Sequence, residues 1–348
     1  MICNVSRLTT FQECRQKDSY LHEHHLIPNR TPTPLLTGGA IHTGLEHFFK
    51  SGSVDVAVVE LERNYRERIG EQTFVLPEES EIYEKELTFS KKAVVAWATH
   101  YEEMGFTVLY PEVTFCVPLP GTEHHCFWMH KLLHPGTADS NINVLAPDGC
   151  GDPRCVVAHH LKGKADGVVN KQGKIWLLET KSSAMTGTPF FDRWFLALQP
   201  TAYMWGVWKA TGVKPHGFIM NVIKKPNHNF KGNLDDWFAR DPFEREAYVR
   251  SDEDFDRFER EAKKMFDERE RAHRDGIIYM NSGSCVMYNR RCHFFDRCQR
   301  NGEEMLGEFR IRPTDYVEEE YYKLAGLEVP KPTLPQIASF EAESEVII

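Results

Sequence analysis

The chain of 348 residues is long enough for one large domain or two small ones. With 41% hydrophobic and 27% charged residues, its composition is that of an ordinary globular protein, and no apolar run is long enough to span a bilayer. A net charge of −9 excludes a protein that coats nucleic acid by bulk positive charge, but not an enzyme with a local basic groove beside an acidic metal site.

The cysteines and the first residues indicate a reducing compartment such as the cytoplasm. Nine cysteines are an odd number, and in a long chain they are more often free thiols or metal ligands than disulfide partners. The first residues lack the basic start and apolar core of a secretory signal. We therefore expect neither a secreted protein nor a membrane protein.

The first third of the chain contains three helical patterns and one strand pattern. Ser6 is expected to cap the first helix, Gly38 and Gly39 to open the second, and Gly105 to end the third. In chain order the predicted elements are helices over residues 6–14, 40–49 and 89–104 and a strand over residues 108–119.

Residues 120–157 are predicted to be a long insertion, because Pro, Gly, Asn, Asp and Cys occur there without periodicity. A hairpin with an extended tip is one form it can take. Some of its residues make a weak zinc candidate, although a plain loop is favoured: Cys150, Cys155, His124, His125, His159 and His160. Residues 328–348 bear Pro and then acidic residues and are expected to form a flexible tail, which leaves residues 1–327 as a single domain.

The centre of the chain carries a predicted β-hairpin with three charged residues. Two β-rich runs, residues 165–169 and 175–180, flank a short connection that contains Gly. Asp166 lies on the first strand, and Glu179 and Lys181 lie at the end of the second. Since residues two apart on a strand share a face, Glu179 and Lys181 project together, and the hairpin brings Asp166 beside them.

These residue types suit metal-dependent hydrolysis of a phosphodiester. Two carboxylates and the backbone oxygen of Thr180 are ligands that Mg²⁺ and Mn²⁺ prefer, and a bound metal lowers the pKa of an attacking water. The ammonium of Lys181 would orient that water and offset charge on the phosphate. Glu-x-Lys is commonly a solvated ion pair, but the apolar run before Glu179 predicts a buried strand, where a charged pair needs a reason.

Two further pairs of residues are spaced four apart on predicted helices. His42 and Glu46 share one face of the helix that follows Gly38-Gly39. Gln199 and Tyr203 are spaced in the same way. Each pair alone is equally compatible with ordinary packing.

Helical and strand patterns alternate after the hairpin. A helix is expected near residues 191–210, and because proline disrupts a helix interior we expect it to begin at Pro200 with Gln199 as its cap. A strand over residues 217–223 and a long amphipathic helix follow. The apolar face of that helix carries Phe255, Phe258, Ala262, Met265 and Phe266.

Three cysteines near the C-terminus are closely spaced. Cys285, Cys292 and Cys298 follow the pattern C-x6-C-x5-C, and a four-coordinate site needs one more ligand, for which Cys14 is the natural candidate. Such a site would clamp the two ends of the fold together. A [4Fe–4S] cluster and Zn²⁺ both suit thiolates, and ordinary buried cysteines are the plain alternative.

In combination and in order, these residues resemble the RecB-like branch of the PD-(D/E)XK nuclease superfamily, especially its iron–sulfur exonucleases, which include phage-type members. The C-x6-C-x5-C spacing differs from the C-x2-C-x5-C of several members, and Gly163 stands in a Gly-x-x-Asp variant of the second motif. The first matching segment is residues 6–14, which end at Cys14. The three nuclease motifs follow: the first contains His42 and Glu46, the second Asp166, and the third Glu179, Thr180 and Lys181. The last segment is the Q-x3-Y motif at Gln199 and Tyr203.

The resemblance implies an α/β fold that is restriction-endonuclease-like, with a mixed central β-sheet flanked by helices and a cysteine cluster that joins the chain ends. It implies a metal-dependent DNA exonuclease of recombination, repair or replication, in the cytoplasm of a bacterial or phage-infected cell. His42, Asp166 and Glu179 would hold Mg²⁺ or Mn²⁺. Gln199 and Tyr203 would contact DNA, and a partner helicase would unwind it, since no Gly-x4-Gly-Lys-Ser/Thr loop is present.

Two other interpretations remain compatible with the sequence. The chain can be a catalytically weak DNA-binding or assembly subunit that keeps the fold, or a binding module stabilised by zinc. The intact set of Asp166, Glu179 and Lys181 favours an enzyme over the first. Zinc predicts a colourless protein and an iron–sulfur cluster a brown one.

Overall fold

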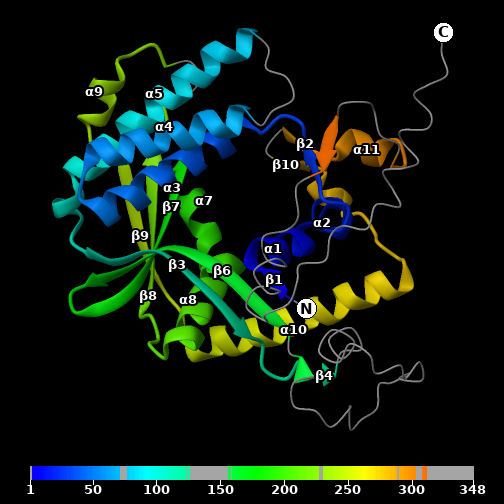
Figure 1. Ribbon diagram of the computed structural model, residues 1–348. Helices are drawn as coiled ribbons and strands as arrows, with labels where there is room; N and C mark the ends of the chain where they lie inside the picture. The colour runs from blue at the N-terminus through cyan, green and yellow to red at the C-terminus, as the bar shows by residue number, and fades with distance from the viewer. Residues whose placement is uncertain are drawn as a thin grey trace, which may run out of the picture.

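The structure is a computed structural model of the chain, drawn in Figure 1. It describes residues 2–70, 77–122, 124–125, 156–157, 159–226, 230–287, 290–302 and 308–311. Most of the predicted insertion and all of the predicted tail therefore lie outside the described residues. No helix in the described part combines the length and the hydropathy that crossing a membrane requires.

A six-stranded mixed sheet forms the centre of the fold (Figure 1). Its strands are β1 (Ile2–Asn4), β3 (Thr107–Pro118), β6 (His160–Lys171), β7 (Lys174–Ser183), β8 (Gly217–Lys224) and β9 (Phe243–Val249). The order is β1-β6-β7-β8-β9, with β3 paired to β6 outside this path. The pairs β1–β6 and β7–β8 are parallel and the other three are antiparallel.

The predicted hairpin is present as the pair β6–β7. Gln172 and Gly173 connect the strands with positive φ angles of 53° and 77°, which is the backbone of a type I′ turn. The side chain of Asn170 accepts a hydrogen bond of 2.9 Å from the N–H of Gly173. This turn chemistry sets the register of the two strands and so places their charged residues.

One stretch of β6 has no described strand beside it on the edge that faces β7. The ladder with β7 ends at the pair Gly167–Leu178, and β1 pairs with residues 160–162 further along β6. Residues 163–166 lie between these two partners, so the sheet opens there. Asp166 stands in this opening, where its carboxylate is free to meet groups other than a neighbouring strand.

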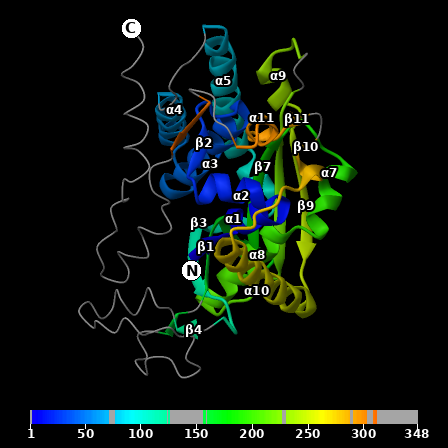
Figure 2. The same ribbon diagram turned by 90° about the vertical axis from the view of Figure 1, so that its right-hand side faces the viewer.

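Helical layers cover both faces of the sheet (Figure 1, Figure 2), which confirms the predicted α/β architecture. Adjacent residues of one strand pack into different layers: Leu177 lies in the core with α8 (Leu198–Thr211) and α10 (Asp252–Asp275), and Leu178 in the core with α3 (Thr33–Ser51), α4 (Val54–Gly70) and α5 (Pro77–Thr99). The remaining short elements of these layers are α1 (Val5–Glu13), η1 (Tyr101–Met104), α7 (Thr188–Asp192), η3 (Arg193–Phe195) and α9 (Leu234–Phe238).

Segments from the two ends of the chain lie side by side beyond the sheet (Figure 2). Strand β2 (Leu26–Pro28) pairs antiparallel with β12 (Phe309–Ile311), and the ring of Tyr20 lies 5.1 Å from that of Phe294. The buried guanidinium of Arg269 forms an ion pair of 2.9 Å with Asp18. The other elements here are α2 (Arg15–His22), η4 (Ser282–Ser284), β10 (Val286–Met287), β11 (Arg290–Arg291) and α11 (Phe295–Gln299).

Only the base of the predicted insertion is described. There β4 (His124–His125) pairs antiparallel with β5 (Val156–Val157). Cys150 and Cys155 of the weak zinc candidate lie outside the described residues. His159 is buried, stacks on Phe266 at 4.7 Å and faces Glu270 at 3.5 Å, so packing alone accounts for its position.

Two predicted helix starts in the N-terminal part are wrong. Helix α1 is capped by Asn4, whose side chain accepts a hydrogen bond of 2.7 Å from the N–H of Arg7, and Ser6 lies inside its first turn. Gly38 and Gly39 do not open a helix but lie within α3, which begins at Thr33. Neither glycine therefore acts as a helix cap.

The predicted cap of α8 is also wrong. The helix begins at Leu198 with Ala197 as its N-cap, and Pro200 is accommodated in the first turn, where its missing N–H costs no hydrogen bond. Gln199 caps nothing; its amide donates instead to the hydroxyl of Tyr203 at 3.0 Å. The third predicted helix, over residues 89–104, begins earlier and ends earlier, as α5, and a 3₁₀ turn separates it from Gly105.

Candidate active site

A pocket of about 380 Å³ opens where the sheet parts between β6 and β7. Helices α3, α4 and α8 and strands β3, β6 and β7 contribute its walls. The predicted site residues that line it are His42, Glu46, Asp166, Glu179, Lys181, Gln199 and Tyr203. Thr180 is buried and lies next to the pocket without lining it. The structure therefore gathers side chains from four separate predicted motifs at one place.

One face of α3 forms the first wall. Gly39, His42, Thr43 and Glu46 all line the pocket, and these positions recur every three or four residues along a helix. The opposite face of α3 packs in the core through Leu36, Ala40 and Leu45 among others. The amphipathic pattern of this helix is thus what directs His42 into the site.

Asp166 is held from two sides in the opening of the sheet. Its Oδ2 accepts a hydrogen bond of 2.7 Å from the backbone N–H of Thr180, and its Oδ1 lies 3.2 Å from Nδ1 of His42. Burial opposes ionisation of Asp166, but His42 and Lys181 outweigh this effect and lower its pKa. Burial likewise disfavours the charged form of His42, yet Asp166 raises the pKa of His42.

Glu179 and Lys181 project from the same face of β7, as predicted. The ammonium of Lys181 donates a hydrogen bond to Oε1 of Glu179. The side chain of Glu179 is buried, and its Oε2 has no hydrogen-bond partner among the described residues. Burial and the neighbouring Asp166 raise the pKa of Glu179 to about 7. Burial lowers the pKa of Lys181, but Glu179 and Asp166 more than compensate and raise it overall.

The raised pKa of Glu179 leads to a prediction about stability. In the unfolded chain Glu179 ionises near pH 4.5 and in the folded protein near pH 7, so folding is progressively penalised as pH rises between these values, by about 3 kcal/mol in total. Glu179→Gln removes the charge while keeping the shape. In metal-free protein we expect this variant to melt a few degrees above the wild type at pH 8 and at the same temperature near pH 4.5.

Thermal unfolding followed by circular dichroism in EDTA measures this difference. Glu246→Gln on the neighbouring strand β9 is a matched control, because Glu246 lies outside the pocket and accepts a hydrogen bond from Tyr248. A Glu179→Gln variant that is less stable than the wild type at pH 8 would show that the buried carboxylate stabilises the metal-free fold.

Glu112 is a pocket residue that the sequence analysis missed. It lies on β3 between Pro111, which pairs with Gly167, and Val113, which pairs with Ala165, so it stands across from Asp166. Its φ of 52° lies in the left-handed region, which is strained for glutamate and common at functional sites. Burial raises the pKa of Glu112, and Lys164 at 2.5 Å opposes that effect. No local motif marks Glu112; only the long-range pairing of β3 with β6 reveals it.

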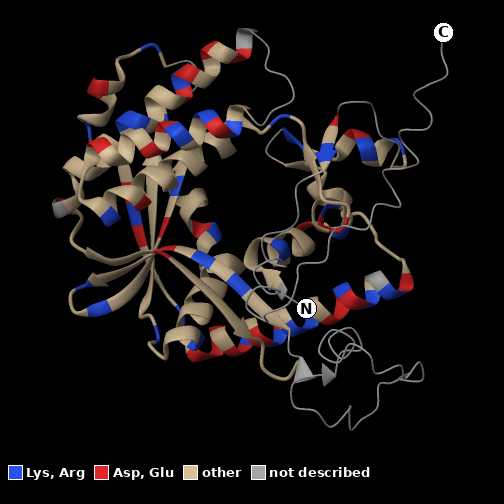
Figure 3. Cartoon of the chain, in the orientation of Figure 1, with Lys and Arg blue, Asp and Glu red and all other residues tan. Residues whose placement is uncertain are grey.

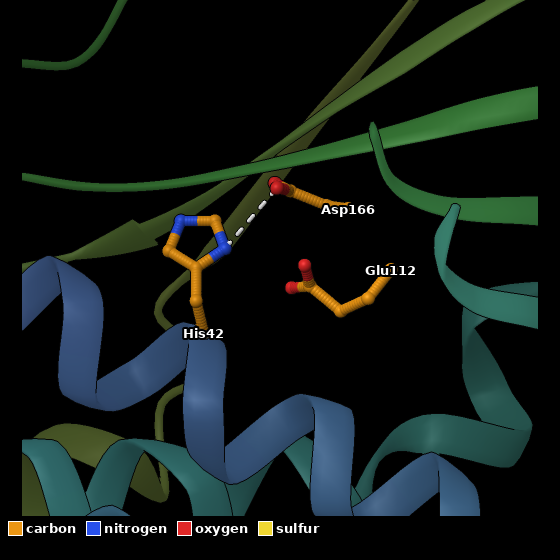
Figure 4. A group of neighbouring side chains, drawn as sticks. All are labelled: His42, Glu112 and Asp166. Carbon is orange, nitrogen blue, oxygen red and sulfur yellow. Dashed lines mark ion pairs between the residues drawn. The ribbon is translucent and has the colours of Figure 1, made fainter. Parts of the chain in front are cut away.

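Three side chains in the pocket can serve as donors to one metal ion. One ligand atom from each of His42, Glu112 and Asp166 lies within 4.8 Å of the other two, and Figure 4 shows the imidazole and both carboxylates converging. One nitrogen and two carboxylates suit Mn²⁺ or Mg²⁺. The unpartnered Oε2 of Glu179 is a further oxygen of the right kind. The residues present therefore fit a divalent cation.

Gln199 and Tyr203 close the pocket on the side of α8. Their hydrogen bond of 3.0 Å joins successive turns of the helix, and the ring of Tyr203 meets Phe115 edge-on at 6.3 Å. Burial and Glu179 raise the pKa of Tyr203, so its hydroxyl keeps its proton and can donate to an anion.

The four thiols that were singled out lie together at the meeting point of the chain ends. All four are free, Cys14 is buried, and the others are half-buried. The N–H of Cys292 donates to the carbonyl of Cys285 at 2.8 Å. Burial raises the pKa of the Cys298 thiol, and the other three cysteines raise it further by their charge. No three of these sulfurs lie within 4.8 Å of one another among the described groups.

Comparisons with known proteins identify a family for this chain. A family model described as the PD-(D/E)XK nuclease superfamily matches residues 3–299, a range that contains all of the sheet except Ile2, the pocket and the four thiols. No curated protein matches the chain. Among solved structures, a crystal structure described as a "Putative exonuclease" from Eubacterium rectale is similar over 91% of each chain, with 12% sequence identity and a TM-score of 0.44.

Proposed function

We propose that this chain, which belongs to the PD-(D/E)XK nuclease superfamily, is a metal-dependent exonuclease that hydrolyses phosphodiester bonds of DNA. The observation that carries the proposal is the convergence of His42, Glu112 and Asp166 beside the pair of Glu179 and Lys181. Such a set combines ligands for a divalent cation with a fixed positive charge. Both are needed to attack a phosphate that already carries a negative charge.

The metal ligands would be His42, Glu112, Asp166 and Glu179, with the backbone oxygen of Thr180. A bound Mg²⁺ or Mn²⁺ supplies a water of lowered pKa and neutralises charge on the phosphate. The backbone N–H of Thr180 holds Asp166 in place through Oδ2, which leaves Oδ1 to face the ion. Metal binding requires the ionised form of Glu179, and a nearby cation favours that form.

Lys181 would act directly on the reacting groups. Its raised pKa keeps the ammonium protonated at neutral pH, so it serves as a donor and a positive charge rather than as a base. From its place beside Glu179 it would orient the attacking water and stabilise the charge that develops on the phosphate. Gln199 and Tyr203, on the opposite wall, would donate hydrogen bonds to the strand next to the scissile bond.

The four cysteines would hold a structural metal centre that joins the chain ends. Four thiolates suit a [4Fe–4S] cluster as well as Zn²⁺, and the family resemblance favours the cluster. The centre would contribute to folding rather than to hydrolysis.

The wider role follows from the same proposal. An exonuclease of this kind would act on single strands or duplex ends in recombination, repair or replication. Free thiols in a metal centre suit a reducing compartment such as the cytoplasm. With no phosphate-binding loop for ATP in the sequence, unwinding would be the work of a partner helicase.

A nuclease assay on anaerobically purified protein tests the proposal. End-labelled single- and double-stranded DNA would be compared with closed circles in Mg²⁺, Mn²⁺ or EDTA, for the wild type and Glu179→Ala. We expect metal-dependent loss of linear DNA that spares circles and is absent in the variant. Cleavage that persists in Glu179→Ala would place the chemistry elsewhere. No cleavage by the intact wild type with either metal would favour a binding or assembly subunit.

A further inference from the structure

One wall of the pocket comes from α4 and takes no part in the proposed chemistry. Asn64 and Arg68 lie four residues apart, hence on one face of this helix, and both line the pocket. The neighbouring face packs in the core through Leu61 and Tyr65. The rotation of α4 about its axis is therefore set by packing, which holds Asn64 and Arg68 toward the pocket.

A glycine makes room for the guanidinium of Arg68. A Cβ atom at Gly39 would overlap Nη1 of Arg68, whereas nothing lies within 4 Å of the corresponding position at Gly38. Nη1 also donates a hydrogen bond of 3.2 Å to the carbonyl of Leu35. Because Gly39 has no positive φ, its backbone does not require glycine. Because Gly39 has no side chain, the guanidinium of Arg68 can approach its Cα closely.

The amide of Asn64 adds a second polar group on the same wall. Its Oδ1 is buried and has no hydrogen-bond partner among the described residues. An amide offers both a donor and an acceptor, so a bound oxyanion with its water would satisfy it. In the pocket, a ligand or a water can complete such a group.

Along the described helices α4 and α10 the charges are of mixed sign. Figure 3 shows Lys and Arg mixed with Asp and Glu along α4 and α10, and the chain carries a net charge of −9. Where charges are mixed in this way, a phosphate is recognised by an individually placed cation rather than by a broad basic track. Arginine suits this task because its planar fork binds two oxygens of one phosphate.

We propose that Asn64 and Arg68 bind a second phosphate group of the substrate strand, beside the scissile phosphate. The proposal rests on the proposed nuclease function of the same pocket. Gly39 precedes His42 by three residues on α3, so this phosphate site lies about one helical turn from the metal-binding group. Either an internal phosphodiester or a terminal phosphate monoester presents the oxygens that the site requires.

Binding of a fluorescent single-stranded oligonucleotide in EDTA, followed by anisotropy, tests the site without catalysis. We expect Arg68→Gln and Gly39→Ala each to raise Kd about tenfold, a loss of about 1.4 kcal/mol, and to raise KM similarly while kcat changes less than about threefold. Gly39→Ala keeps every charge and displaces only the end of a flexible side chain, so the helix is retained. Arg63→Gln, on the exposed side of α4 with Glu60 and Glu67, should bind like the wild type.

Oligonucleotides with a 5′-phosphate, a 3′-phosphate or neither distinguish the two sources of the phosphate. A defect confined to one terminally phosphorylated substrate identifies a monoester, and an equal defect with all three identifies an internal diester. Wild-type affinity in Arg68→Gln or in Gly39→Ala would overturn the proposal, as would an equal loss in Arg63→Gln. Absence of cleavage by the wild type would refute the nuclease function but leaves this binding comparison intact.

Discussion

Asp166→Asn is expected to lower the rate of DNA cleavage at least about a thousandfold, the equivalent of roughly 4 kcal/mol in transition-state stabilisation. The amide still fits the opening between β6 and β7, and its oxygen can still accept the N–H of Thr180. It loses the negative charge that faces His42 and the proposed ion. Single-turnover kinetics with saturating DNA measures the effect on the chemical step.

Calorimetric titration with Mn²⁺ connects this loss of rate to the metal. We expect affinity to fall at least tenfold in Asp166→Asn, because one of the converging carboxylates no longer carries charge. Asp235→Asn is the matched control, since Asp235 is exposed on α9 and pairs only with the surface residue Lys92 in the described contacts. Asp166→Asn that retains a tenth of the wild-type rate would remove Asp166 from the chemistry.

The hairpin could be predicted from sequence because all of its determinants are local. Turn residues set the register of β6 and β7, and the two-residue period of a strand then places Glu179 and Lys181 on one face. His42 was different: the periodicity of its helix showed only that it shares a face with Glu46, and the family resemblance assigned it to the site. Family resemblance added the order of the motifs, and the structure confirms that the chain folds as a mixed sheet between helical layers.

Residues brought in by long-range pairing were beyond prediction. Glu112 reaches the site only because β3 pairs with β6 around a bulge between Val108 and Tyr110, which no local pattern encodes. Arg68 reaches it only because α4 packs beside α3, with Gly39 at the contact. In the sequence, Glu112 and Arg68 each resemble an ordinary charged surface residue, and only the packing of the fold shows that they line the pocket.

The predicted helix starts were wrong for a different physical reason. Gly38 and Gly39 were interpreted by their effect on the backbone, but the helix around them is stabilised by its buried apolar face, which tolerates the small cost of glycine. Asn4 displaced Ser6 as a cap because β1 ends there and leaves its backbone extended. Tertiary packing thus determines where these helices begin, which residue propensity alone does not specify.

Cys14→Ser is expected to abolish the proposed metal centre and to destabilise the whole domain. Cys14 ends α1, and Asn281 donates its backbone N–H to this sulfur at 3.4 Å, so the thiol joins the N-terminal helices to the segment that carries Cys285. Loss of a ligand should remove visible absorbance and bound iron. Because metal binding contributes directly to folding, we expect the melting temperature to fall by on the order of 10 °C.

Metal analysis together with visible absorption separates the possible outcomes for this centre. Iron and brown colour in the wild type, both lost in Cys14→Ser, would support a [4Fe–4S] cluster, whereas one zinc per colourless chain would support the alternative. Cys116→Ser is the control, because Cys116 is an exposed free thiol on β3. Wild-type protein without either metal would reject the centre. The buried contacts of Arg269 with Asp18 would then have to hold the chain ends together with the small apolar cluster around Phe294.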